Sequence, residues 1–194
     1  MARTWKFSEP LVLASASPRR KELISRVAEN VEILPADIDE STVTASSPRA
    51  LVRELSRRKA LAVKALLQCR GKVVVGADTV VFLDKLYGKP RDFDDAVRIL
   101  SALNGREHYV YTGVTVAADS GSVTFSVRSS VVFRHLSDEE IKNYVSTHRP
   151  YDKAGAYAIQ EGVVVQSYKG SLTNIIGLPV EKLSEVLRGE KWLG

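Results

Sequence analysis

The chain has 194 residues, of which 44% are apolar and 26% charged, and this composition predicts one ordinary soluble domain over residues 1–194. The single cysteine, Cys69, excludes an internal disulfide and suits a reducing compartment. The net charge of +5 is spread along the chain, which argues against a nucleic-acid binder. Residues 1–10 lack an apolar signal segment and no window approaches 18 apolar residues, so we expect a cytoplasmic protein without a membrane span.

Short apolar runs predict the strands. Residues 11–14 form one such run, and residues 72–83 are nearly continuously apolar, as expected of a strand buried on both faces. Two β-rich stretches, 109–118 and 123–136, flank a predicted hairpin turn, and residues 155–166 are predicted to be extended.

The helices are predicted from the residues that begin them. Ser17 and Ser47 each precede a proline, and serine is a favoured N-cap while proline is favoured at the first helical position. Asp92 is a third N-cap, and Ser137 with Glu140 forms a capping box. One helix is expected to begin at residue 18. Four more are expected over about residues 48–68, 93–103, 137–147 and 179–187. Because strand and helix signals alternate, the chain is predicted to be an α/β protein.

Four charged side chains contradict their local context, which is common at functional sites. Arg19 and Arg20 lie in the first turn of a helix, where a bound phosphate would make them favourable; the alternative is a solvated basic turn. Lys59 falls in the apolar stripe of its helix, and either reaches past its neighbours to water or points into a cleft. Asp78 lies in an apolar strand, so it must be paired, bind a metal or anchor hydrogen bonds. Gly76 nearby indicates close approach by another group.

Other local signals are weaker. Lys153 precedes small residues and Gln160 follows an extended run, but this segment alone is typical of a loop that enters a strand. The three histidines share no metal-ligand spacing with Cys69. The sequence has no P-loop, no Gly-x-Gly-x-x-Gly and no nucleophile elbow.

Taken together, several segments closely resemble the Maf family of nucleotide pyrophosphatases. They follow the family's order over about residues 11–182, nearly the whole chain, which makes the resemblance highly specific. The matching segments are Leu13-Ala-Ser-Ala-Ser-Pro-Arg-Arg-Lys-Glu-Leu23, Ile38-Asp-Glu40, Lys59-Ala60, Gly76-Ala-Asp-Thr-Val80, Gly88-Lys-Pro90, Gly105-Arg-Glu-His108, Thr112-Gly113, Asp152-Lys-Ala-Gly-Ala-Tyr157 with Gln160, and Ile176-Gly-Leu-Pro179.

The resemblance implies an elongated mixed β-sheet flanked by helices, with two lobes around a deep cleft, similar to the inosine triphosphate pyrophosphatase fold. Family members hydrolyse nucleoside triphosphates to the monophosphate and pyrophosphate with a divalent cation (Mg²⁺, Mn²⁺ or Co²⁺), a nucleotide diphosphatase activity suggested to remove unwanted nucleotides. A homodimer is also implied. The catalytic aspartate maps onto Asp78 and the early acidic position onto Glu40. The phosphate ligands map onto Ser15, Arg20, Lys59, Lys89 and Lys153.

Three positions resemble the dTTP/UTP type of the family, namely Arg19, Thr79 and Gln160. The 7-methyl-GTP type instead has glutamine after the aspartate and glutamate in the late strand, and it is the closest alternative. A glutamine amide offers both a donor and an acceptor, so Gln160 suits the N3–H and adjacent carbonyl of uracil or thymine.

These residues suggest a mechanism. Asp78 and Glu40 would hold the metal, and Asp78 would orient or deprotonate the attacking water. The basic residues would stabilise charge on the leaving pyrophosphate. Two alternatives from other classes are a non-catalytic nucleotide-binding regulator of cell division and a nucleic-acid binder that uses the net positive charge.

Overall fold

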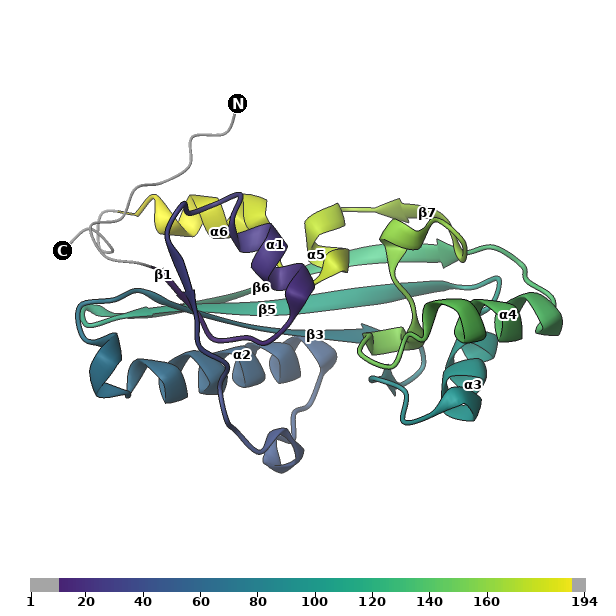
Figure 1. The fold of residues 1–194 in the computed structure, drawn as a ribbon, viewed down its shortest axis with the longest axis horizontal. Coiled ribbons are helices and arrows are strands. Elements are labelled where there is room, and N and C mark those ends of the chain that lie inside the picture. The colour runs from purple at the N-terminus through teal and green to yellow at the C-terminus, as the bar shows by residue number, and fades with distance from the viewer. Residues whose placement is uncertain (1–10, 190–194) are drawn as a thin grey trace.

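The computed structural model describes residues 11–189, so the expectation for the N-terminal segment 1–10 lies outside the described residues. The described part forms an elongated molecule around one seven-stranded mixed sheet with helices on both faces (Figure 1), which confirms the predicted α/β class. The strand order is β2-β1-β3-β5-β6-β7, with β4 paired to β3. The strands are β1 (Leu11–Leu13), β2 (Val31–Ile33), β3 (Val74–Phe82), β4 (Leu86–Tyr87), β5 (Glu107–Ala118), β6 (Gly121–Phe133) and β7 (Val165–Lys169).

Long antiparallel pairs make up the centre of the sheet. β5 pairs with β3 along the whole of β3 and with β6 in a hairpin that closes at Ala118 opposite Gly121, where the turn was expected from the sequence. β1 pairs in parallel with both β2 and β3, so the sheet is mixed.

The predicted N-caps begin four of the helices. Ser17, Ser47 and Asp92 each accept a hydrogen bond from a backbone N–H three residues later, and Ser137 forms a complete capping box with Glu140. The helices are α1 (Pro18–Ile24), α2 (Pro48–Lys64), α3 (Phe93–Leu103), α4 (Asp138–His148), α5 (Leu172–Ile176) and α6 (Val180–Leu187). Among the described helices, none is long and apolar enough to cross a membrane.

The helices divide between the two faces of the sheet. α2 packs against β3 and β5 on one face, while α1, α5 and α6 lie on the other (Figure 1). Gly76 and Gly113 allow α2 to approach, because a Cβ at Gly76 would lie 2.5 Å from the Ser56 carbonyl oxygen and one at Gly113 2.1 Å from that of Val52. The close approach expected at Gly76 is therefore confirmed, and the approaching group is the backbone of α2.

Three clusters of buried apolar residues pack against the sheet, and the two larger ones correspond to the two expected lobes. One gathers α3, α4 and the adjoining parts of β3, β5 and β6, and the other gathers β1, α1 and α6 with β5. Between them lies the cavity described below.

Some local expectations were wrong. Residues 155–166 are mostly not extended: two short 3₁₀ turns, Ala154–Ala156 and Ile159–Glu161, precede β7. Left-handed backbone at Gly155 (φ 74°) and Ala156 (φ 60°) bends this segment back on itself. α2 ends at Lys64 rather than near residue 68, and the short elements β2, β4 and α5 were not expected.

Candidate active site

The site lies where β3 has an open edge. β1 pairs only with Val74 and Val75 of β3, and β4 pairs only with Val81 and Phe82, so no strand in the described part of the chain covers residues 76–80 on that side. A cavity of about 310 Å³ opens at this gap. Because successive strand residues point to opposite faces, the side chains in the gap reach two different groups of helices.

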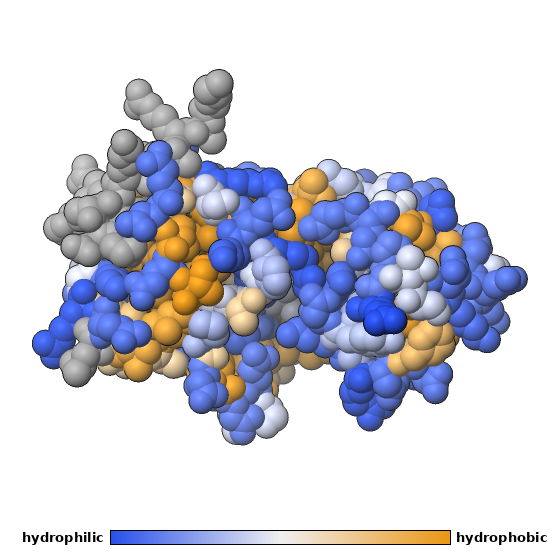
Figure 2. All heavy atoms as spheres, in the orientation of Figure 1, coloured by the Kyte–Doolittle hydropathy of each residue, from blue (hydrophilic) through white to orange (hydrophobic). Residues whose placement is uncertain are grey.

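Nine of the ten predicted site residues line this cavity. They come from α1, the segment before α2, α2 itself, β3, the segment after β4 and the loop that follows α4. They are Arg19, Arg20, Glu40, Lys59, Asp78, Thr79, Lys89, Lys153 and Gln160. The tenth, Ser15, lies behind Arg20 and accepts a hydrogen bond from its Nη1 at 3.2 Å. Figure 2 shows mainly hydrophilic side chains around the middle of the molecule on the face turned to the viewer.

Lys59 and Asp78 form a buried ion pair at the cavity. The Lys59 Nζ lies 2.6 Å from Asp78 Oδ1 and 2.8 Å from Glu40 Oε1, and the Lys59 and Asp78 side chains are each 11% exposed. Lys59 therefore points into a cleft rather than past its neighbours to bulk water, and Asp78 is paired, one of the outcomes its sequence context required. Two carboxylates from distant segments thus converge on one cationic group.

Arg20 is held by three acceptors. Its Nε donates to the Gly177 carbonyl at 2.9 Å, its Nη1 to Ser15 and its Nη2 to Thr79 Oγ1 at 3.0 Å. Burial lowers the pKa of Arg20, an effect that the nearby Asp78 carboxylate opposes. The alternative of a solvated basic turn is thus wrong for Arg20. A guanidinium has five N–H donors, so two remain for an anion in the cavity.

Arg19 and Lys153 share a carboxylate that the sequence-based site did not include. Asp152 Oδ2 accepts from Arg19 Nη1 at 2.7 Å, and Asp152 Oδ1 accepts from Lys153 Nζ at 2.9 Å. Although burial raises it, hydrogen bonds from Lys153 and Arg19 lower the pKa of Asp152 overall. Asp152 therefore ties the loop after α4 to the start of α1. Its place in the matching segment before Lys153 was the available signal.

The remaining wall of the cavity is largely apolar. It includes Leu55, Val110, Ile175 and Tyr157. Only Tyr157 belongs to a matching segment, and none of the four was predicted as a site residue, because each resembles an ordinary core residue. Tyr157 is buried and its hydroxyl lies 3.0 Å from His108 Nε2; burial raises the pKa of Tyr157. An apolar wall beside clustered charges suits a ligand with a flat ring at one end and a polyanion at the other.

The donor set fits a hard divalent cation. Glu40 and Asp78 direct carboxylate oxygens at the same point, which the Lys59 ammonium fills in this structure. Among residues 11–189 no cluster of three or more His, Cys, Asp or Glu side chains could hold a metal by itself. Mg²⁺ is commonly bound by one or two carboxylates together with substrate phosphates and water, so two ligands are sufficient.

Comparisons with known proteins agree with this architecture. Residues 10–190 match the model of the family described as Maf-like protein. The dTTP/UTP pyrophosphatase of Thermosipho africanus is 43% identical over 180 residues, covering 91% of each chain, and that of Geobacter sp. strain M21 is 44% identical over 183 residues, covering 92% of this chain and 94% of the other. The solved Staphylococcus aureus Ham1 protein shares the fold, with a TM-score of 0.55 at 15% identity over 94% of this chain and 100% of that one. This chain belongs to the Maf-like protein family.

Proposed function

We propose that this protein is a nucleoside triphosphate pyrophosphatase that hydrolyses dTTP and UTP to the monophosphate and pyrophosphate. The observation that carries the proposal is the convergence of Asp78, Glu40 and Lys59 in a cavity that also holds arginines and further lysines. The relatives named dTTP/UTP pyrophosphatase, which match over about nine tenths of the chain, support the same substrate class.

The basic residues would bind the triphosphate. Arg20 is already fixed by protein acceptors, so little side-chain entropy is lost when its free N–H groups meet phosphate oxygens. Lys89 is exposed at the cavity and can move onto the phosphates. Together with Arg19 and Lys153, these groups would stabilise the negative charge that develops on the leaving pyrophosphate.

Asp78 would act on the attacking water. Water attacks the α-phosphorus, the bond from that phosphorus to the oxygen bridging to the β-phosphorus breaks, and the electron pair leaves with pyrophosphate. Asp78 would orient this water and accept its proton. When bound by Asp78 and Glu40, a divalent metal (Mg²⁺, Mn²⁺ or Co²⁺) would neutralise phosphate charge and lower the pKa of water.

Gln160 is our candidate for reading the base. It lies exposed on the Ile159–Glu161 turn and lines the cavity, so its amide is free to meet a ligand edge. A pyrimidine with N3–H beside a carbonyl would pair with both halves of that amide.

We also propose a cytoplasmic homodimer, for which light scattering in solution provides the test of subunit number.

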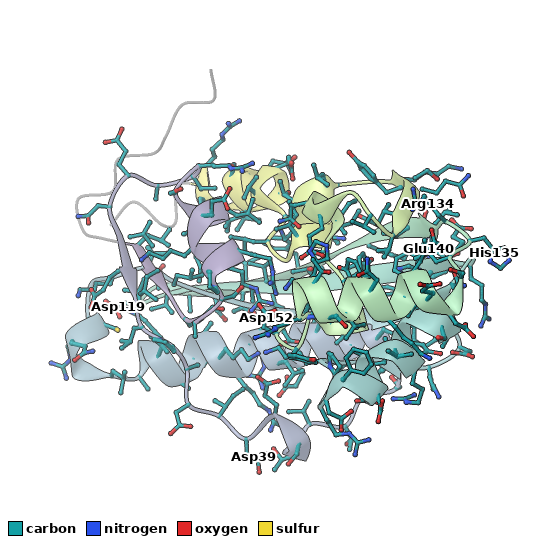
Figure 3. The ribbon with its side chains drawn as sticks, turned by 45° about the vertical axis from the view of Figure 1, so that its right-hand side comes forward. Asp39, Asp119, Arg134, His135, Glu140 and Asp152 are labelled. Carbon is teal, nitrogen blue, oxygen red and sulfur yellow. The ribbon has the colours of Figure 1, made fainter. Side chains whose placement is uncertain are left out.

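The decisive experiment measures products across a nucleotide panel with Mg²⁺, including dTTP, UTP and 7-methyl-GTP. We expect pyrophosphate from UTP and dTTP, and a loss of at least about 10²-fold in turnover for Asp78→Asn. Asp119→Asn is the matched control, because Asp119 pairs with Lys64 at the β5–β6 turn, far from the cavity (Figure 3).

Each alternative predicts a different result. Release of orthophosphate alone from UTP would contradict attack at the α-phosphorus, and faster turnover of 7-methyl-GTP would contradict the pyrimidine assignment. Nucleotide binding without any hydrolysis would point to the non-catalytic regulator. Full activity in Asp78→Asn would remove Asp78 from the chemistry.

A further inference from the structure

A chain of hydroxyl groups runs from the Arg20 guanidinium into the core. Arg20 Nη2 donates to Thr79 Oγ1 at 3.0 Å, Thr79 Oγ1 lies 3.0 Å from Thr112 Oγ1, and Thr112 Oγ1 donates to the Asn174 carbonyl at 3.0 Å. Thr112 is fully buried on β5, directly opposite Thr79 in the strand register. Neither Thr112 nor Asn174 lines the cavity.

The donor inventory sets the direction of this chain. A carbonyl can only accept, so the single hydroxyl hydrogen of Thr112 goes to Asn174. Thr112 Oγ1 must then accept a hydrogen bond from Thr79 Oγ1. This bond uses the only hydroxyl hydrogen of Thr79. The 3.4 Å contact from Thr79 to the Gly177 carbonyl is longer and competes for the same hydrogen. The lone pairs of Thr79 are left to accept from Arg20, and donors aligned in one direction polarise one another.

This arrangement changes how Thr79 would contribute. In this network its hydroxyl has no hydrogen to offer a substrate, and it faces α1 and α5, whereas adjacent Asp78 faces α2. We propose that Thr79 and Thr112 are positioning residues that fix the Arg20 guanidinium for a triphosphate, with Thr112 acting through Thr79 without touching the ligand. The inference rests on the proposed function in that the anion is taken to be the nucleotide's triphosphate.

The segment that receives the chain is itself firmly held. The side-chain Nδ2 of Asn174 donates to the Val110 carbonyl and to Ser129 Oγ. The carbonyl of Gly177, the C-cap of α5, accepts from Arg20 Nε. α5 and its C-cap thus hold the Arg20 guanidinium in two ways. The Gly177 carbonyl accepts from it directly, and the Asn174 carbonyl holds it through Thr112 and Thr79. Loss of the Thr112 hydroxyl would leave Thr79 free to turn towards Gly177 and would loosen the second of these.

Thr112→Val tests the proposal, since valine keeps the shape and removes the hydroxyl. The probe is inorganic triphosphate, with its dissociation constant measured by calorimetry, so the result does not depend on turnover or on any base. We expect about fivefold to tenfold weaker binding, because Thr79 loses the acceptor that orients its hydroxyl and its hydrogen bond from the charged Arg20 guanidinium is weakened. Thr112→Ser keeps the hydroxyl and should bind within about twofold of wild type.

Thr115→Val is the matched control. Thr115 is equally buried on the same strand, but its hydroxyl contacts Ser56 and Thr124 rather than the site. It should lose stability comparably while binding inorganic triphosphate like wild type. Equal weakening in Thr112→Val and Thr115→Val would show a general structural effect and overturn the proposal.

A double-mutant cycle with Arg20→Ala tests whether Thr112 affects triphosphate binding through Arg20. If Thr112 acts through Arg20, Thr112→Val should have no further effect on triphosphate binding once Arg20 is gone. Additive losses would overturn the proposal. If Thr112→Val does not fold, Thr79→Val removes the hydroxyl acceptor of Arg20 directly, and unchanged binding in that variant would also overturn the proposal. If Thr112 and Arg20 are coupled in triphosphate binding but the protein hydrolyses no nucleotide, the proposed function is refuted and this inference is not.

Discussion

Gly76→Ala tests whether the α2–β3 contact sets the geometry of the site. The new Cβ would lie 2.5 Å from the Ser56 carbonyl oxygen and 2.6 Å from the Ala60 amide nitrogen, both backbone atoms of α2. Ordinary contact requires at least 3.4 Å, so the helix must withdraw locally by most of an ångström. Lys59 lies between these two residues and would be carried away from Asp78, whose Oδ1 is now 2.6 Å from its Nζ.

We expect two effects of this displacement. Overpacking of this kind destabilises by about 1–3 kcal/mol, and each kcal/mol lowers the Tm of a chain this long by roughly 2–4 °C. Misplacement of catalytic groups by about 1 Å reduces turnover roughly 10²-fold. Thermal unfolding measures the first effect, and kcat for UTP, measured well below the Tm of the variant, measures the second.

Two variants control this experiment. Gly88→Ala lies at the same cavity, but its Cβ would meet nothing within 4 Å, so its Tm should stay close to wild type. Adding Ala60→Gly to Gly76→Ala removes the 2.9 Å contact with the Ala60 Cβ and leaves both backbone contacts, so it should not restore activity. A Gly76→Ala protein with wild-type Tm and kcat would refute the reasoning.

Three further predictions concern the base, the metal and pH. Gln160→Glu should lower kcat/KM for UTP and dTTP about tenfold to hundredfold, because a carboxylate offers no donor to a pyrimidine carbonyl; unchanged selectivity across the nucleotide panel would exclude Gln160 from the base site. Lys59→Met should bind Mn²⁺ without nucleotide roughly tenfold more tightly in calorimetry, since removing about 1.4 kcal/mol of repulsion from the site suffices for that factor; weaker binding would mean that Lys59 does not compete with the metal. Burial lowers the pKa of His108 to about 4 from 6.5, so the folded state resists a proton that the unfolded state accepts. Stability should therefore fall by up to about 3 kcal/mol as pH drops from 6.5 to 4, and urea titrations should show this slope flattened in His108→Gln and retained in His135→Gln, whose histidine is exposed.

Local chemistry made much of the fold predictable. The N-caps at Ser17, Ser47, Asp92 and Ser137 are satisfied within three residues of the chain, so their meaning does not depend on the rest of the molecule. The long strands were equally predictable from the sequence, because each carries enough apolar residues to require burial. By contrast, residues 154–161 form turns that depend on positive φ at Gly155 and Ala156, which composition alone does not reveal.

The candidate site was predictable in membership but not in its contacts. Asp78 and Lys59 stood out because each is costly in an apolar setting, and that cost is a local property. Their pairing could not be predicted from the sequence, because it depends on how α2 packs against β3. The contacts of Asp152 with Arg19 and of Thr112 with Thr79 likewise join distant segments and leave no local sign.

The sequence by itself determined the α/β class, four helix starts and the charged residues that need partners, because capping and burial costs act over a few residues. Only the tertiary structure decided that Lys59 meets both Asp78 and Glu40, and that Arg20 is fixed by Thr79 and Gly177, 59 and 157 residues away in the chain. The physical reason is that β1 and β4 both stop short along β3. Their ends leave an open edge on which segments from the whole chain converge.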